Sequence, residues 1–563
     1  MRFKTWYNTL IALLFGFLFV SVAEHYYGVA MEGDVGCFEA ISHQMKIGQR
    51  LYTDVYDNKA PGIFYLNYLI PNLGFKSITS SWIIHMVSFA LFLATFGKLY
   101  NQWTKVNVAF GIGAAIFIVF ALRTIVFFWP AFFVGGYTEE IGSYFFIAGF
   151  LLLYQSSNQW IDYPEIKPQI RQLKLLLSGL LLGTAVLIKE PFVFFVPVAM
   201  IWLLFVKRNE IIFLILGFVG PWLIHFILLL KNDSIWNYFH YLQFALNYGN
   251  ANKSFVNAEK LNEVIQPIQF DSLPVVNVIQ LFVFSGFIIL LVYQWFLKNR
   301  VKNKLDVKPN LSQVFILFIT YLLFLVGSKV FGLLGKGAYL HYQIPEYLFS
   351  WLGLVLFLHA IYLHLLCVNQ PHKLYHVAIV IATTAMLVIS NSLVKFKMPT
   401  GHTTMLKTLK DPHFINDSKY PKLVKLMDEE MAWNDFLFKQ NIQLPKRIEI
   451  FIDDPHLGRF YGYLNSQYRT CFPCPYWVYF HSDDSTLTNK LWPFLEQNRS
   501  KIIRQLQERP PQFVLTGENK GPFGTFTDLI LFFSQNFRKR GEFYLGEKKL
   551  ELFERISPDE LYH

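Results

Sequence analysis

Ionisable side chains form a few short clusters beside the apolar segments of this chain, and these clusters are where chemistry is expected. The first cluster, "EGDVGCFEAISHQMKIGQRLYTDVYDNKAPG", contains Asp34 and Lys59. Others are "YTEE" at 137–140, "LIKEPF" at 187–192 and "HYQIPE" at 341–346. Carboxylates can accept protons, and lysines can bind anions. Because charges near membrane depth are costly, such residues usually face a cavity or each other and mark a functional site.

The elements that must position these residues are membrane helices. The chain has 563 residues, of which 53% are apolar and 58 are Phe, and these values exclude an ordinary soluble protein. Apolar runs of about 20 residues, the length that crosses a bilayer core, recur up to about Asn391. We therefore predict about eleven transmembrane helices, at 7–24, 80–99, 106–126, 133–154, 173–189, 191–206, 211–230, 275–297, 312–331, 346–367 and 374–394.

The segment 173–206 is one continuous apolar run except for "LIKEPF". Lys189 and Glu190 carry charge, and Pro191 disfavours a continuous helix. We therefore expect two short helices with a break between them.

Positive charge indicates the orientation. With Arg2 and Lys4 inside, the basic loops 155–172, 207–210 and 298–308 also lie inside, as the positive-inside rule requires. The clusters named above then fall on the outer face, and so does the region after the last helix. The net charge of +11 is explained largely by this topology, so nucleic-acid binding is not expected.

Two features of the sequence leave alternatives open. Residues 1–23 also resemble a signal peptide, and cleavage after Ala23 would not change the later topology. Cys471 and Cys474 form a CxxC in the region expected outside, where a disulfide could persist. We expect these cysteines to be unpaired or locally bridged.

Secondary structure is also expected outside the membrane helices. In the first outer loop, 25–79, Phe38, Ile41 and Met45 recur at helical spacing before Gly48, which predicts a helix lying in the membrane interface. After the last span, 447–454, 511–517 and 548–556 alternate like strands, and 526–541 is typical of an amphipathic helix. We therefore expect a transmembrane domain at 1–394 and a small α/β domain at 395–563 on the outer side.

The first loop resembles that of the C-type, membrane-embedded glycosyltransferases of family 39, the protein mannosyltransferase and aminoarabinose transferase group. The matching residues are Asp34, Lys59, Pro61, Gly62 and Tyr65. The segments "YTEE" at 137–140, "KEP" at 189–191 and "HYQIPEY" at 341–347 resemble later motifs of the same group, in the same order. The resemblance covers about residues 1–370.

This resemblance implies a C-type glycosyltransferase fold and inverting transfer of a sugar from a polyprenyl-phosphate donor to a hydroxyl of a glycan, lipid or protein. The site would lie on the outer face of a bacterial cytoplasmic membrane, and the donor would enter from the bilayer. Asp34 would be the base that removes the acceptor proton. Lys59, assisted by Arg123 and Lys189, would stabilise the departing lipid phosphate.

The remaining motif residues would bind substrate or acceptor: Tyr137, Glu139, Glu140, His341 and Tyr342. Some members of the group hold a metal through a glutamate directly before the first-loop lysine, where this chain has Asn58, with Asp57 one residue earlier. We therefore predict no metal ligands, and a divalent metal stays an open possibility.

Bland alternatives exist for each residue: Asp34 could be a solvated loop carboxylate and Lys59 an interfacial lysine with its amine in water. For the whole chain, the alternatives are a lipid or sugar transporter or flippase, and a non-catalytic membrane subunit.

Overall fold

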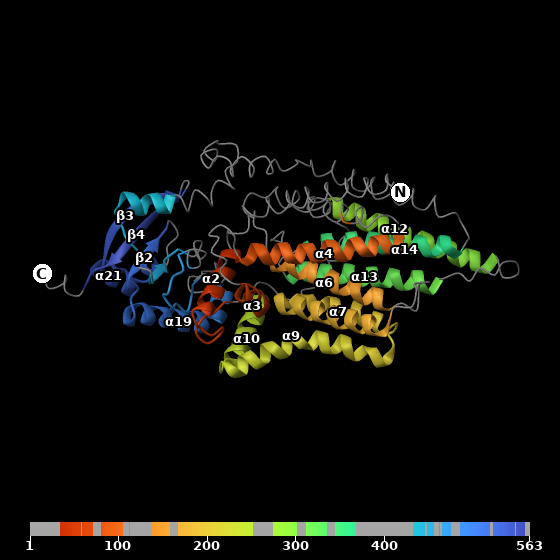
Figure 1. Cartoon of the computed structure of the whole chain (residues 1–563), viewed down its shortest axis with the longest axis horizontal. Helices are drawn as coiled ribbons and strands as arrows, with labels where there is room; N and C mark the ends of the chain where they lie inside the picture. Colours follow the sequence, from red (N-terminus) through yellow and green to blue (C-terminus); the bar gives the residue numbers. More distant parts are fainter. Residues whose placement is uncertain are drawn as a thin grey trace.

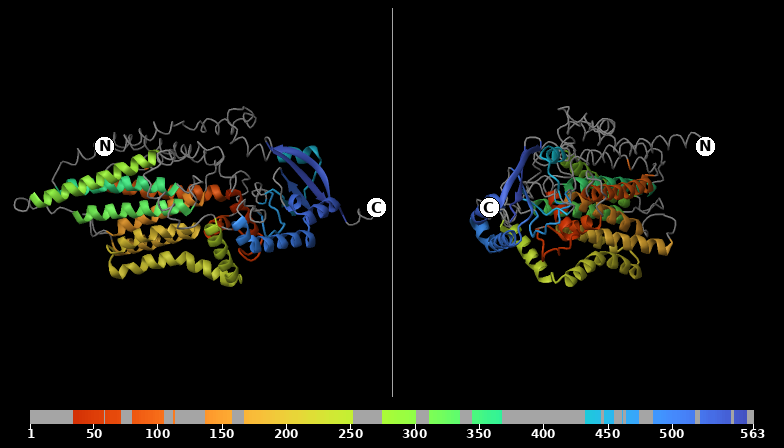
Figure 2. Two further views of the ribbon diagram at one scale, coloured as in Figure 1. Left: turned by 180° about the vertical axis from the view of Figure 1, so that it is seen from behind. Right: turned by 60° about the vertical axis from the view of Figure 1, so that its left-hand side comes forward.

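The computed structural model describes residues 34–57, 59–70, 80–104, 112, 137–157, 167–251, 274–300, 311–334, 344–367, 432–444, 447–454, 461, 464–473, 485–517, 522–545 and 548–557. A bundle of long helices forms one end of the described part, and an α/β unit forms the other (Figure 1). The short helices α2 (Asp34–Lys46) and α3 (Pro61–Leu69) lie where the two meet. Figure 2 shows the same arrangement from behind.

The bundle is built from α4 (Ser80–Thr104), α6 (Thr138–Ser156), α7 (Pro168–Ile188), α8 (Val196–Leu203), α9 (Ile211–Lys231), α10 (Ile235–Ala251), α12 (Pro274–Arg300), α13 (Leu311–Leu334) and α14 (Ile344–Cys367). In the described residues, five stretches are long and apolar enough to cross a membrane: Pro168–Ile188, Arg208–Lys231, Val278–Phe296, Leu311–Gly332 and Ile344–Ile361. The first of these stretches is α7. The second consists of the 3₁₀ turn η3 (Arg208–Glu210) and α9, and the remaining three lie on α12, α13 and α14. The spans expected at 80–99 and 133–154 fall on α4 and α6. Those expected at 7–24, 106–126 and 374–394 lie outside the described residues, apart from Ile112.

Small residues allow a close backbone contact between α7 and α9. A Cβ at Gly179 would lie 2.1 Å from the Leu214 carbonyl oxygen, and one at Gly183 would lie 2.3 Å from that of Phe218. The spacing of these two glycines, four residues apart, is the arrangement that lets membrane helices approach through their backbones. On the other side, α7 packs against α6.

The predicted break in 173–206 is confirmed. Helix α7 ends at Ile188, Lys189 is extended (φ −152°, ψ 110°), and a 3₁₀ helix, η2 (Glu190–Phe195), leads into α8. Pro191 fits the first turn of η2, where its missing N–H costs no hydrogen bond. The stretch Glu190–Leu203 is shorter than a full membrane span, so the second of the two expected spans is only partly realised.

The unit after the bundle contains a four-stranded sheet of order β1-β2-β4-β3, made of β1 (Ile450–Ile452), β2 (Phe513–Thr516), β3 (Phe537–Leu545) and β4 (Lys548–Arg555). Strands β1 and β2 are parallel and are joined through α19 (Ser485–Glu508), and the other pairs are antiparallel. The three strands expected from alternating residues are confirmed. The short helices α20 (Pro522–Thr525) and α21 (Thr527–Asn536) follow β2.

The expected helix at 526–541 is wrong beyond Asn536. Helix α21 ends there, and β3 begins at Phe537. Residues 537–545 pair along their whole length with β4, with a bulge between Lys539 and Gly541. The strand partner therefore overrides the local helical pattern.

Helix α2 is buried on both sides instead of resting one face in the membrane interface. Phe38 and Ile41 belong to the core of the bundle, whereas Cys37 and Ala40 belong to the core of the α/β unit. The helix is followed by Gly48, as expected, with a positive φ of 92° that favours glycine.

Polar contacts tie α2 to the α/β unit. His43 Nε2 lies 2.7 Å from the Ser466 carbonyl oxygen, Gln44 Nε2 donates to the Tyr468 carbonyl at 3.1 Å, and Gln44 Oε1 accepts from the Thr470 N–H at 3.1 Å. Cys37 is disulfide-bonded, whereas Cys471 is free and buried, which agrees with the unpaired alternative for Cys471; Cys474 lies outside the described residues.

Candidate functional site

The break after α7 is the centre of a polar cluster at the end of the bundle that faces the α/β unit. Lys189 is 8% exposed although it carries a full charge. The backbone leaves the helical conformation at Lys189, because a continuous helix would lose the hydrogen bond that Pro191 cannot donate and would set its ring against the Leu187 carbonyl; the chain turns into η2 instead. This break lets a lysine at the end of an apolar helix turn towards neighbouring elements.

Helix α3 packs directly against this break through Gly62. A Cβ at Gly62 would lie 2.6 Å from the Leu187 carbonyl oxygen and 2.7 Å from the Ile188 nitrogen, so only glycine fits. Lys59 lies two residues before the start of α3, and Lys189 follows Ile188 directly. The contact therefore brings the two predicted phosphate-binding lysines to the same edge of the bundle.

The start of α6 meets the break from another side. Glu139 Oε1 lies 2.8 Å from Lys189 Nζ, and both side chains are almost entirely buried. The Thr138 hydroxyl donates to Glu139 Oε2 at 3.1 Å. Gly142 makes room for the Phe192 ring, since a Cβ there would lie 2.3 Å from it. Two of the residues predicted from separate motifs therefore form a buried ion pair.

Glu140 has a different hydrogen-bond partner from Glu139. Its Oε1 accepts a hydrogen bond from the Tyr144 hydroxyl at 2.8 Å, one turn along the same helix. Glu140 is 1% exposed, and Tyr137, directly before α6, is 6% exposed. Both predicted substrate-binding residues are therefore buried beside the ion pair.

Two tyrosines, Tyr52 and Tyr241, lie on the side of the cluster next to α10. Tyr241 donates to Glu190 Oε1 at 2.8 Å, and its ring stacks on that of Tyr52 at 4.9 Å between centroids. Burial, together with the nearby charge of Glu190, raises the pKa of both hydroxyls well above the ordinary value, so both keep their protons. The Tyr52 hydroxyl donates to the carbonyl oxygen of Lys59 at 3.2 Å.

Lys59 is held through its backbone and is half-buried. Its N–H donates to Asp57 Oδ1 at 2.9 Å, and its carbonyl accepts from Tyr52. Tyr52 has a positive φ of 66°, a conformation that non-glycine residues adopt rarely and that is concentrated at functional sites. The loop before Lys59 therefore has a defined shape set by its own side chains.

The other predicted site residues are placed only in part. Asp34 is the first residue of α2, so it lies at the end of that helix away from Gly48; its side chain lies outside the described part of the chain, as do Arg123, His341 and Tyr342. Within the described residues, no group of three or more His, Cys, Asp or Glu side chains could hold a metal ion.

Sequence reasoning missed a second polar cluster, between α12, α13 and α14. Lys329 pairs with Glu346, and Gln280 Nε2 donates to Glu346 Oε1 at 2.9 Å and to the Ser350 hydroxyl oxygen at 3.0 Å. The signal was present, because Lys329 and Glu346 are charged residues within or beside apolar runs. Each was read as part of a span rather than as a partner of the other.

This second cluster lies over the same aromatic core as the first. Phe349, one turn after Glu346, is 4.4 Å from Phe195 of η2 between ring centroids and 5.9 Å from Phe146 of α6. Phe331, two residues after Lys329, is 5.1 Å from Phe192. Apolar rings from α6, η2, α13 and α14 therefore belong to one connected aromatic cluster.

No protein-family model matches this chain, and neither does any curated protein. Among solved structures, it is similar to the crystal structure of ArnT from Cupriavidus metallidurans bound to undecaprenyl phosphate, at 12% identity and a TM-score of 0.46, over 97% of this chain and 98% of that one. It is also similar to the archaeal oligosaccharyltransferase AglB from Archaeoglobus fulgidus in complex with an inhibitory peptide and a dolichol-phosphate, at 10% identity and a TM-score of 0.37, over 92% of this chain and 70% of that one. Similarity at this level does not establish a shared fold or activity, so a function must come from the residues themselves.

Proposed function

We propose that this chain is an integral membrane glycosyltransferase that moves a sugar from a polyprenyl-phosphate donor to an acceptor hydroxyl at the outer face of a bacterial cytoplasmic membrane. The observation that carries the proposal is the contact of Gly62 with the end of α7, which brings the Lys59 and Lys189 segments to one edge of an apolar bundle. An anionic group on a lipid chain is the ligand that fits cations beside membrane-embedded apolar helices.

The chemistry follows from the demands of the reaction. Asp34 takes the proton of the acceptor hydroxyl, whose oxygen forms the new bond to the anomeric carbon. The bond between that carbon and the phosphate oxygen breaks, and its electron pair stays on the phosphate. Attack from the face opposite the phosphate inverts the anomeric centre.

Lys59 is the first candidate to stabilise the leaving phosphate. It is half-buried and lies at the loop edge, whereas Lys189 is almost entirely buried and forms an ion pair with Glu139; Lys59 is therefore the more accessible of the two. A buried carboxylate partner neutralises most of the field of the Lys189 amine. Arg123 and Lys189 are therefore proposed as assisting cations.

The remaining proposed contacts concern the sugar and the acceptor, which is a glycan, lipid or protein. Tyr137, Glu139 and Glu140 would line the site from α6, and His341 and Tyr342 would line it from the segment before α14. The α/β unit would lie on the same outer side, because it packs on α2, the helix that begins at Asp34.

The test is release of polyprenyl phosphate from a panel of polyprenyl-phosphate sugars by the purified, reconstituted chain, with acceptor extracts added. We expect turnover by the wild type and its loss in Asp34→Asn and Lys59→Ala, with both variants folded. Full activity of Asp34→Asn would rule out the base assignment. Movement of the intact donor across the bilayer, without release of phosphate, would favour the transporter or flippase.

A further inference from the structure

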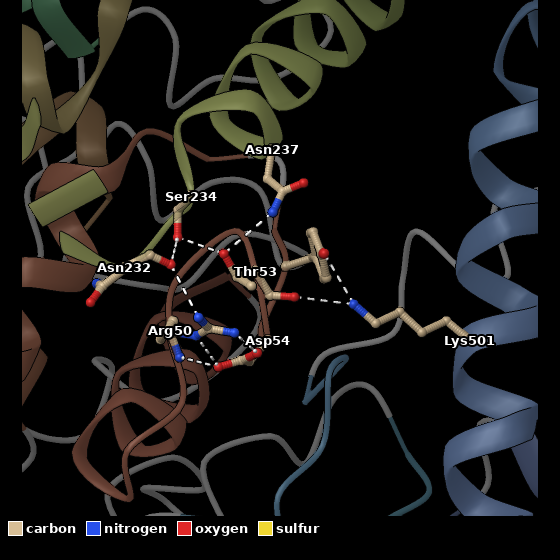
Figure 3. A network of polar contacts seen from close by, with 8 residues as sticks. Arg50, Thr53, Asp54, Asn232, Ser234, Asn237 and Lys501 are labelled. Carbon is tan, nitrogen blue, oxygen red and sulfur yellow. Dashed lines mark hydrogen bonds and ion pairs between the residues drawn. The ribbon is translucent and has the colours of Figure 1, made fainter. Parts of the chain in front are cut away.

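One lysine of the α/β unit reaches the loop that precedes Lys59. Lys501, on α19, donates from Nζ to the Thr53 carbonyl oxygen at 3.1 Å and to the Tyr56 hydroxyl at 3.0 Å. The same amine lies 4.1 Å from the centre of the Tyr56 ring. Figure 3 shows the side chain extended from α19 across to the loop.

The α/β unit also holds Tyr56 from a second side. The Tyr56 N–H donates to the Cys471 carbonyl oxygen at 3.1 Å, and its ring stacks on Phe472 at 5.7 Å between centroids. Tyr56 is therefore held through its backbone, its ring and its hydroxyl.

The opposite side of the loop is bound to the bundle. The Thr53 hydroxyl lies 2.5 Å from the Ser234 hydroxyl and accepts a hydrogen bond from Asn237 Nδ2 at 3.3 Å. Arg50 forms an ion pair with Asp54 and donates to the Asn232 carbonyl oxygen at 3.2 Å (Figure 3). The loop is thus fixed between the turn before α10 on one side and α19 on the other.

The position of this loop determines the position of Lys59. Asp57, which follows Tyr56 directly, accepts the Lys59 N–H, and the Tyr52 hydroxyl donates to the Lys59 carbonyl. Tyr52 has a positive φ, which persists only where the surroundings hold it. A displacement of 53–56 therefore moves both backbone anchors of Lys59.

We infer that Lys501 is a positioning residue: by holding the loop 52–57, it sets the place of Lys59 in the donor site. Most exposed lysines contribute little to stability, because the free energy of one solvated contact does not offset the entropy lost in ordering a long side chain. Lys501 makes three contacts with one short loop, and this convergence distinguishes it. The inference rests on the proposed function for the role of Lys59, and the α/β unit becomes part of the machinery that prepares the site.

The chain offers a matched control on the same helix. Arg504 lies three residues after Lys501, and its Nε pairs with Glu508 of α19 at 2.7 Å. Lys501→Met and Arg504→Met each remove one positive charge from α19, but only the first removes contacts to the loop. Lys501→Arg keeps the charge and a donor.

The experiment measures two properties of the full-length reconstituted chain: hydrogen exchange of the amides at 52–57, and kcat and KM for release of polyprenyl phosphate. In Lys501→Met we expect faster exchange at 52–57, and kcat about tenfold lower, the effect of losing one or two ordinary hydrogen bonds that hold the loop. Lys501→Arg should recover most of kcat, and Arg504→Met should stay within about twofold of the wild type, as expected for an exposed pair.

The outcomes separate the two proposals. If exchange and kcat of Lys501→Met match those of Arg504→Met, the positioning role is overturned. If exchange accelerates along the whole of α19, Lys501 merely stabilises its own helix, and the inference also fails. If the wild type releases no phosphate from any donor, the proposed function fails, and exchange at 52–57 alone then decides whether Lys501 holds the loop.

Discussion

Lys189, directly after the last residue of α7, and Glu139, in the first turn of α6, form an ion pair with 2.8 Å between Nζ and Oε1. Both side chains are almost fully buried, 10% and 2% exposed. Removing one partner of such a pair leaves the other charge buried without its ionic partner, which costs far more than the pair itself contributes.

We therefore predict that Lys189→Met lowers the apparent unfolding midpoint by several degrees, since breaking a buried pair typically costs about 3–5 kcal/mol. The double variant Glu139→Gln, Lys189→Met should recover much of this loss, because no charge then stays buried alone. Lys439→Met, which breaks an exposed pair with Asp435, is the control and should leave the midpoint unchanged. Additive losses in the double variant would show that the two residues are not coupled.

Gly62→Ala should separate α3 from α7. Its Cβ would lie 2.6 Å from a backbone oxygen, and backbone cannot move aside as a flexible side chain can. We expect loss of donor turnover of about tenfold or more, because small displacements of groups that position a substrate are costly. The measurement is kcat/KM for release of polyprenyl phosphate.

The control for this substitution is Gly332→Ala in the last turn of α13, where a Cβ would meet nothing within 4 Å. Alanine favours the helix over glycine by about 0.5–1 kcal/mol, so this variant should be as stable as the wild type or more so, with unchanged turnover. Equal effects of the two substitutions would contradict the close approach at Gly62.

The attachment of α2 to the α/β unit should weaken in acid through His43. Burial, the largest cause, lowers the pKa of His43 from its ordinary value; the contact with the Ser466 carbonyl opposes this, and Lys46 adds to it. In the unfolded chain the imidazole takes up a proton near pH 6.5, so folded stability decreases as the pH falls from about 6.5 towards the lower folded pKa.

The measurement is the apparent unfolding midpoint at about pH 7.5 and about pH 5.5, on either side of the unfolded pKa, for the wild type and His43→Gln. Glutamine keeps a donor for the Ser466 carbonyl and does not titrate. We expect the variant to show the smaller difference between the two values. The same difference in both proteins would assign the pH dependence to groups other than His43.

Cys471 should be inert towards alkylation in the folded chain. It is free, 3% exposed, and burial raises the pKa of its thiol to about 12, so the reactive thiolate is scarce. We expect iodoacetamide at about pH 8 to label Cys471 only after denaturation, because the ordinary thiol pKa of about 8.5 returns in the unfolded chain. Peptide mass spectrometry locates the label, and rapid labelling of the native protein would contradict the burial of this residue.

Local sequence patterns predicted the elements whose structure depends mainly on residues nearby in the sequence. Apolar length, helical spacing and turn residues predicted most of the described bundle helices, the end of α2 near Gly48 and the break at Lys189, because these depend on the chemistry of a few consecutive residues. The ordered motifs of the first 370 residues brought Lys59, Lys189, Glu139 and Glu140 under consideration together.

Only the tertiary structure decided which of these residues contact one another and which surfaces are covered. The pairing of Lys189 with Glu139, that of Lys329 with Glu346, and the burial of α2 on both sides all join segments distant in sequence. Strand β3 exists because β4 supplies hydrogen-bond partners for residues that would otherwise extend a helix. A single sequence specifies each local preference, but the partner that satisfies a buried charge or a strand edge is chosen by packing in three dimensions.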